Sequence, residues 1–188
     1  MFIIKRDLQR VLNSKDVTVL LSDDNINSSE VLNNCIDFAV DFVRSKIAHR
    51  FDPDQIFIDV QTYSSTATYS VNDQVDYQGT LYYCILVTTA GILPTNATYF
   101  TKGDIRKPLA RDYVTKETIY QLFMRIQPRN IPEWLILDHD KMIEHLNMIS
   151  RGVDTPNLPL YNDVNGDPDD TLGQRTIYNS ETQIKWNY

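Results

Sequence analysis

A tyrosine-rich, nearly uncharged segment in the middle of the chain constrains the fold most. Residues 62–103 hold six of the eleven tyrosines of the protein, one lysine, two aspartates and no tryptophan. They contain runs of β-branched and aromatic residues, clearest over residues 80–87, and a Gln78-Gly79 pair that suits a tight turn. Because the sequence on both sides has helical spacing instead, we predict a small antiparallel β module inserted into a helical frame, an α+β fold.

The segment before the module, residues 1–61, is predicted to be helical. A short helix is expected over Lys5–Leu12. A long helix follows, because Asn27 stands three residues before Glu30 as in a capping box, and apolar residues continue down to Ile47. Its predicted apolar stripe consists of Val31, Cys35, Phe38, Ala39, Phe42 and Val43.

Helical spacing returns in residues 104–153. Thr115 is expected to cap a helix that Pro128 stops, and Arg129-Asn130-Ile131-Pro132 predicts a corner. The last helix runs to about Ser150 and is followed by Gly152, where a helix-terminating glycine belongs. Its predicted buried face consists of Met142, Ile143, Leu146 and Ile149, and we expect Leu146 and Phe42 to lie in the core of the frame.

Residues 154–188 lose all periodicity and are predicted to form an extended C-terminal docking arm. They carry six acidic and two basic residues and are broken by prolines and glycines. A purely disordered tail is poor in large apolar residues, whereas this one keeps several to its end. We therefore predict that the arm docks on a partner through Ile177, Tyr178, Ile184, Trp186 and Tyr188.

Charge and composition exclude several classes of protein. The chain has 188 residues and a formal net charge of −7, which argues against a general nucleic-acid binder. The longest apolar run, residues 82–87, is too short to span a membrane, and the N-terminal residues lack the pattern of a signal peptide. Cys35 and Cys84 have no metal-type spacing and are expected to be buried free thiols in a reducing compartment.

A search for catalytic and metal-binding signatures finds none that fits. There is no nucleophile elbow, phosphate-binding loop or dinucleotide fingerprint. The carboxylates of Asp138 and Asp140 would point about 200° apart on a helix, so Asp138-His139-Asp140 does not favour a metal. The acidic loop that begins at Asp163 has Pro168 where a calcium loop needs glycine. We therefore expect no catalytic residue, cofactor or metal.

The aromatic residues of the module have two interpretations. Tyr77, Tyr82, Tyr99 and Phe100, with Tyr69 and Tyr83, could form a surface for glycans or for docking. The favoured interpretation is that such residues fill a small β core and its rim.

The order of motifs in the frame resembles the head–tail adaptor (connector) proteins of tailed bacteriophages. The residues that carry the resemblance are Ile4-x-x-Asp7-Leu8, Ile47-Ala48-x-Arg50-Phe51-Asp52, Arg129-Asn130-Ile131-Pro132-Glu133, and Gly152 followed by Leu158-Pro159. The resemblance covers roughly residues 1–61 and 104–188. It implies a helical bundle, a ring that follows portal symmetry and is commonly dodecameric, an arm that docks on neighbours, and no enzyme activity.

The module resembles the small chitin-binding-type domains of bacterial chitinases. The similarity lies in Tyr69-x-x-x-Asp73-x-Val75-x-Tyr77-x-Gly79-x-Leu81-Tyr82, although Asn72 replaces a preferred glycine and the usual exposed tryptophan is missing. In a virion protein such a module could serve as a docking surface.

These resemblances imply a structural virion protein at the head–tail interface, assembled in the host cytoplasm. The expected partners are the portal protein, copies of the chain in a ring, and further tail proteins, with DNA passing through the lumen without sequence-specific binding. The alternative is a glycan-binding virion or tail component that acts through the module. An enzyme or an unrelated cytosolic protein also stays open.

Overall fold

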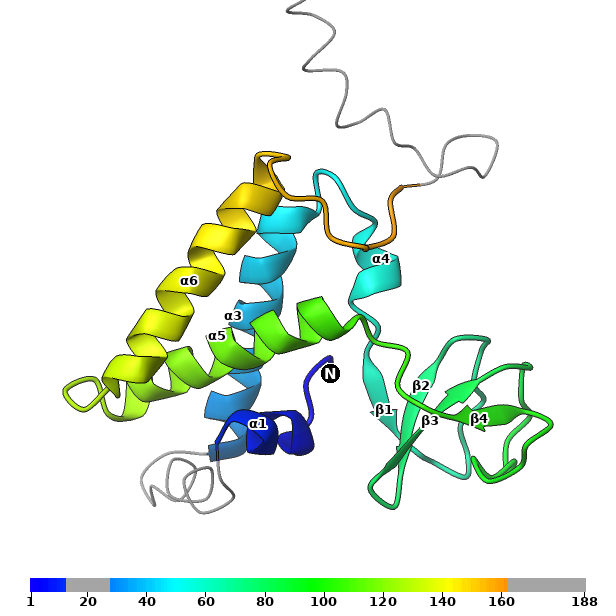
Figure 1. Ribbon diagram of the computed structural model, residues 1–188. Helices are drawn as coiled ribbons and strands as arrows, with labels where there is room; N and C mark the ends of the chain where they lie inside the picture. The colour runs from blue at the N-terminus through cyan, green and yellow to red at the C-terminus, as the bar shows by residue number, and fades with distance from the viewer. Residues whose placement is uncertain (13–27, 162–188) are drawn as a thin grey trace, which may run out of the picture.

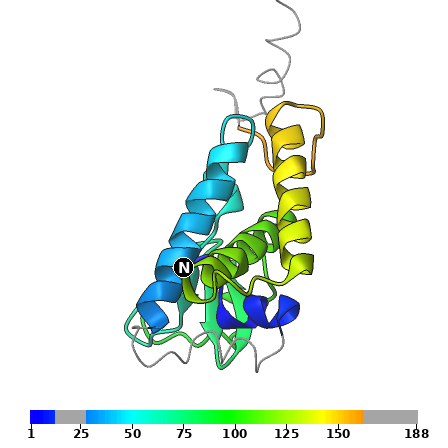
Figure 2. The same cartoon turned by 90° about the vertical axis from the view of Figure 1, so that its left-hand side faces the viewer.

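The computed structural model describes residues 1–12 and 28–161 as a helical frame that carries a small β-sheet module on one side (Figure 1). The helices of the frame are α1 (Lys5–Val11), α3 (Ser28–Ile47), α4 (Pro53–Ile56), α5 (Pro108–Ile126) and α6 (Glu133–Ser150). Figure 2 shows α3 and α6 as two upright helices, with α5 crossing between them and α1 below. The chain therefore has the predicted mixture of helices and sheet.

One hydrophobic core joins the frame segments on both sides of the module in the sequence. Buried side chains from α1, α3, α5 and α6 form a single cluster, which also includes residues near both ends of the described chain, such as Phe2 and Leu158. The core is thus closed by residues more than a hundred positions apart. The buried residues that α6 contributes to this core are Leu135, Met142, Leu146 and Ile149. The last three were predicted to be buried from their apolar spacing.

The buried face of α3 overlaps only in part with the predicted stripe. Cys35, Ala39, Val43 and Ile47 are buried as predicted, and Ile36 joins them. Phe38, on the predicted stripe, is 45% exposed, and Phe42 is only half-buried; their rings stack along one flank of the helix at 6.3 Å between centroids. The prediction that Phe42 lies in the core is therefore confirmed only in part, because its ring packs against the core cluster without being buried in it.

Helix α5 begins eight residues earlier than predicted, with Lys107 as its cap in place of Thr115. Pro108 occupies its first turn, where the missing N–H of proline costs nothing. Thr115 is therefore not a cap: it lies inside the helix, and its hydroxyl donates to the Arg111 carbonyl at 2.7 Å. The end of α6 agrees with prediction, since Gly152 has a φ of +76° and its N–H donates to the Ile149 carbonyl.

The sheet of the module has the order β1-β2-β3-β4. Its strands are β1 (Val60–Thr62), β2 (Gln74–Tyr77), β3 (Thr80–Cys84) and β4 (Phe100–Lys102). Gln78 and Gly79 both have positive φ and form the predicted tight turn between β2 and β3. The β2–β3 and β3–β4 pairs are antiparallel, but β1 pairs with β2 in parallel.

The prediction of a purely antiparallel module is therefore wrong at its first strand. The sheet also starts at Val60, inside the segment predicted as frame. Residues 63–73 form the connection that lets β2 run in the same direction as β1. Tyr69 organises it, because the Tyr69 hydroxyl accepts from the Ser64 N–H at 2.7 Å.

A buried arginine joins the frame to the module. Arg106 follows the last strand and is 2% exposed. Its guanidinium donates to the Asp7 carboxylate of α1 at 2.7 Å, to Asp104 at 2.8 Å and to the Phe2 carbonyl. Burial alone would lower the pKa of Arg106, but its hydrogen bonds to Asp104 and Asp7 outweigh burial and hold that pKa above its usual value.

Candidate docking surfaces

The aromatic residues of the module fill its small core and its rim, which is the interpretation that the sequence favoured. Phe100 is 2% exposed, and its ring packs edge-on against Tyr69 at 5.8 Å between centroids. The alternative, that Phe100 belongs to a glycan or docking surface, is wrong because the ring is buried in the module. Tyr82 and Tyr99 are half-buried against the same core, and Tyr77 is half-buried as well.

The exposed apolar surface of the module is aliphatic instead. Two backbone hydrogen bonds place residues 69–72 beside residues 84–88: Asn72 donates to the Cys84 carbonyl at 2.8 Å, and Thr88 to the Tyr69 carbonyl at 3.0 Å. Exposed aliphatic side chains gather along these segments and the following loop. This aliphatic patch consists of Val71, Ile85, Leu86, Val87 and Leu93. Sequence reasoning missed it, because the run from Thr80 to Val87 was assigned as strand, whereas β3 ends at Cys84.

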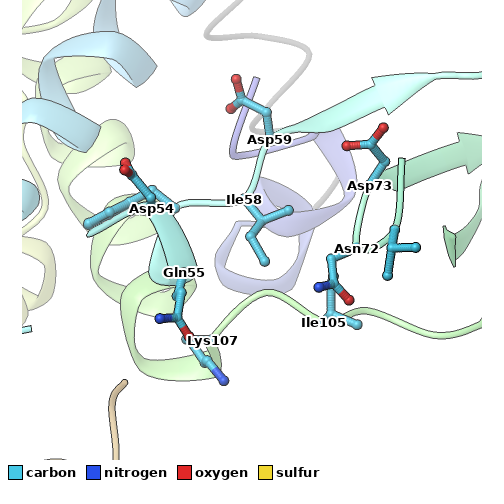
Figure 3. A pocket seen from close by; sticks show the side chains of 10 residues that line it. Asp54, Gln55, Ile58, Asp59, Asn72, Asp73, Ile105 and Lys107 are labelled. Carbon is cyan, nitrogen blue, oxygen red and sulfur yellow. The ribbon is translucent and has the colours of Figure 1, made fainter. Parts of the chain in front are cut away.

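A polar groove of about 520 Å³ lies where the module meets the frame (Figure 3). Asp54 and Gln55 of α4 line one side, and Lys107 lies at the start of α5. The Val60–Gln74 pairing places Asp59 beside Asp73, and Figure 3 shows these two carboxylates away from Lys107. Asp54 pairs with Arg44 at 2.9 Å, and Asp59 pairs with the N-terminal amine at 3.2 Å. Two of the three carboxylates that line the groove therefore already have a cationic partner.

A second groove, of about 610 Å³, runs along α3. We call it the α3 groove: its apolar lining comes from Phe2, Ile36, Val40 and Phe57, and its acidic rim from Asp37 and Asp41. Within residues 1–12 and 28–161, neither rim carboxylate forms a salt bridge. The α3 groove therefore combines polar residues with the partly exposed Val40 and Phe57, and its rim carries two carboxylates without a salt bridge.

The first residues of the predicted arm belong to the frame. Residues 154–161 lie against the turn after α3: the Asp52 N–H donates to the Pro159 carbonyl at 2.9 Å, and Phe51 pairs with Leu160. The Tyr161 hydroxyl donates to the Ala48 carbonyl at 2.8 Å. The predicted boundary at residue 154 is thus too early. The arm residues Ile177, Tyr178, Ile184, Trp186 and Tyr188 lie outside the described residues.

Side chains of the frame hold residues 154–161, which we call the root of the arm: Arg50 comes from the turn after α3 and His145 from α6. Arg50 donates to the Ile149 carbonyl at 2.9 Å and the Asp154 carbonyl at 3.2 Å. The imidazole of His145 bonds on one side to the Tyr113 hydroxyl and on the other to the Asp154 carboxylate. The hydrogen bond from His145 holds the pKa of Asp154 below its usual value, and burial raises the pKa of Tyr113 to about 12 together with the charges of Asp112 and Asp154.

The residues examined for chemistry have structural partners. His139 bonds to the buried Glu117 at 3.0 Å and stacks on Tyr120 at 3.8 Å between centroids. Asp138 pairs with Lys116, so Asp138-His139-Asp140 is not a converging cluster. Over the described ranges, no group of three or more His, Cys, Asp or Glu side chains is placed to hold a metal ion.

Both cysteines are free and buried, as predicted. Burial raises the pKa of the Cys35 and Cys84 thiols, which keeps them in the unreactive protonated form. None of the helices in residues 1–12 and 28–161 is long and apolar enough to cross a membrane.

Comparisons with protein-family models, with curated proteins and with solved structures found no match to this chain.

Proposed function

We propose that this chain is a structural protein of a tailed-phage virion, a head–tail connector that forms a ring beneath the portal and links it to the tail. The ring is expected to be dodecameric, like the portal, and its lumen to pass DNA without binding it. The net charge of −7 supports this role, because an acidic protein does not adhere to phosphates. The protein acts by assembly and carries out no catalysis.

The observation that carries this proposal is that segments bearing the connector resemblance pack together. The Arg50-Phe51-Asp52 segment receives Leu158-Pro159 through the Asp52–Pro159 hydrogen bond and the pairing of Phe51 with Leu160. Leu8 of the N-terminal motif belongs to the same buried core as Phe51 and Leu158. These segments are far apart in the sequence. If their resemblance to the connector motifs were due to chance, there would be no reason to expect them in contact.

The root of the arm supports the docking role of the residues that follow. Residues 158–161 are fixed on the frame by the Asp52–Pro159 and Ala48–Tyr161 bonds, so the chain leaves the frame from a defined point. A docking segment that starts from a fixed point needs less ordering on binding than one on a free linker. We propose that the apolar residues near the C-terminus bury themselves on the portal or a neighbouring subunit.

The module is proposed to contact another virion protein. Sugars stack on exposed aromatic faces, and Phe100 and Tyr69 are buried. The aliphatic patch is 42–61% exposed at its five residues, and an exposed apolar cluster of this kind is typical of protein contacts. This observation favours the connector over the glycan-binding alternative. Glycan-array binding that disappears in Tyr99→Ala would reverse that preference.

Electron microscopy and native mass measurement of the purified protein, alone and with portal rings of the same phage, test the proposal. The expected result is a closed ring, either free or seated on the portal. A protein that stays monomeric in both conditions contradicts it.

Deletion of residues 174–188 tests the arm separately. The truncated chain should keep the helical circular-dichroism signal and fail to co-sediment with portal rings. A control variant, Lys141→Ala at an exposed position of α6 outside the arm and the aliphatic patch, should attach like the full chain. Portal attachment of the truncated chain at full strength would contradict the docking role.

A further inference from the structure

The corner between α5 and α6 exposes apolar and basic side chains together. Met124, Trp134 and Leu137 are exposed, with Trp134 at 48%. Arg125 and Arg129 are exposed too, and neither forms a salt bridge with a residue in the described part of the chain. We call these five residues the basic corner. Glu133, in the first turn of α6, is the acidic residue beside them, where the helix dipole favours it.

The α3 groove has the complementary character. Val40 and Phe57 are the partly exposed apolar residues of its lining, and Asp37 and Asp41 on its rim have no salt-bridge partners among the described residues, since Arg44 of the same lining pairs with Asp54. An exposed tryptophan flanked by arginines is the kind of anchor that such a groove accepts, because Trp and Arg contribute most to protein interfaces. The two surfaces match in apolar content and in sign of charge.

The chain does not satisfy this match within one molecule, because among the described residues neither Arg125 nor Arg129 forms a salt bridge with Asp37 or Asp41. The basic corner lies at the C-terminal end of α5, at the left of Figure 1, whereas the N-terminus, which borders the α3 groove, lies nearer the other end of that helix. Helix α5 has 19 residues and therefore spans roughly 28 Å. Two complementary surfaces on different sides of one molecule join separate copies head to tail.

We infer that the α3 groove receives the basic corner of a second copy of this chain, with Trp134 against Val40 and Phe57, and with Arg125 and Arg129 beside Asp37 and Asp41. The inference rests on the proposed ring and names its subunit contact. Because the two surfaces differ, the contact is heterologous and repeats around a ring rather than closing a two-fold dimer.

A charge exchange tests the contact in the full chain. Asp37→Arg with Asp41→Arg reverses the groove, and Arg125→Glu with Arg129→Glu reverses the corner. Either pair should weaken self-association at least about tenfold in analytical ultracentrifugation, since like charges then face each other. The chain with all four substitutions should recover self-association, because every copy carries both reversed surfaces.

Three further measurements sharpen the test. Glu144→Arg with Arg151→Glu, which reverses exposed α6 charges outside the corner, should assemble like the wild type. Trp134→Ala should also weaken assembly, and added salt should weaken the wild type. Circular dichroism confirms that each variant is folded. Either charge-reversed pair assembling normally, or failure of the fourfold variant to recover, overturns the inference.

The same experiment separates this inference from the proposed function. If the charge-reversed variants form normal rings on the portal, the connector role stands and the subunit contact is wrong. If the fourfold variant recovers self-association but no form of the protein binds portal rings, the contact stands and the connector role is wrong. A wild-type protein that is monomeric alone and with portal rings overturns both.

Discussion

The frame and the module are stabilised in different ways. The frame closes an extensive, largely aliphatic core from α1, α3, α5 and α6, which are remote in the sequence. The module builds a core of four buried residues, Tyr69, Val75, Cys84 and Phe100, within one continuous segment. The stability of the module therefore depends on strand pairing and aromatic contacts within one segment. The stability of the frame depends on side chains that come together only when distant parts of the chain have folded.

The two regions meet through few contacts, and these decide how independent they are. Arg106 ties the exit of the module to α1. Arg6 donates to the Gly79 carbonyl at the hairpin turn at 2.7 Å, and the Val60 N–H donates to the Met1 carbonyl at 2.9 Å. The Arg106 contacts are buried, whereas the Arg6–Gly79 contact is exposed. Breaking the buried contacts should therefore cost far more than losing the exposed one.

The largest effect is expected from Arg106→Met. Removing the guanidinium leaves the Asp7 carboxylate, which is 1% exposed, without its buried partner. Breaking a buried ion pair in this way lowers the free energy of unfolding by about 3–5 kcal/mol. Denaturant unfolding of the full chain measures it. Arg111→Met is the control, because Arg111 contacts Asp104 from a half-buried position and should cost less than about 1 kcal/mol. A loss below 1 kcal/mol for Arg106→Met would show that the junction does not depend on this arginine.

Truncation in the core of the frame should follow. Leu146→Ala removes a fully buried side chain and should lower the free energy of unfolding by about 2–5 kcal/mol. Phe42→Ala should cost less, because its ring is half-buried on the flank of α3. The sequence analysis predicted both residues to lie in the core, so the ratio of the two losses measured by chemical denaturation tests the orientation of α3. Equal losses would restore Phe42 to the core.

These examples show what sequence can predict in this chain. The ends of α3 and α6 are predictable from local signals, such as Gly152 after a periodic run. The tight turn is predictable from the Gln78-Gly79 pair, and both residues have positive φ in the structure. The first turns of α5 were missed because residues 108–114 bury Ala110, Tyr113 and Val114 without a clean stripe. Nothing in the sequence separates Arg106 from the other basic residues, since its role depends on Asp7, 99 positions away.

The candidate surfaces were less predictable than the fold. Strand-forming aromatic residues look alike in sequence whether they face the core or solvent, so the burial of Phe100 depends on the register of β3 with β4. The α3 groove and the basic corner combine residues from separate elements, which no local pattern links. The root of the arm was assigned to the arm because its prolines hide its contact with residues 48–52.

Removing the module should have a smaller effect than the core substitutions. Replacing residues 62–103 with a short Gly/Ser linker leaves the core of the frame complete, since that core draws nothing from the module. The loss of the Arg6–Gly79 bond should cost on the order of 1 kcal/mol. A cooperative thermal melt with a retained helical circular-dichroism signal is expected. Arg6→Ala in the full chain is the matched control, and non-cooperative unfolding of the shortened chain would show that the frame needs the module.

The smallest effect concerns pH, and it tests whether the root of the arm belongs to the frame. Asp154 accepts a hydrogen bond from His145, which holds its pKa below the ordinary value of 3.8. A carboxylate whose pKa is lowered on folding adds stability that is complete above its unfolded pKa and disappears as pH falls through its folded pKa. The free energy of unfolding of the wild type should therefore fall more steeply than that of Asp154→Asn as pH decreases below about 5. Asp104 contributes the same acid dependence to both proteins, because the substitution leaves its bonds to Arg106 unchanged. The difference between the two pH curves therefore reports on the root of the arm and not on the bonds of Arg106 between frame and module. Parallel pH curves for the two proteins would mean that residues 154–161 leave the frame in solution.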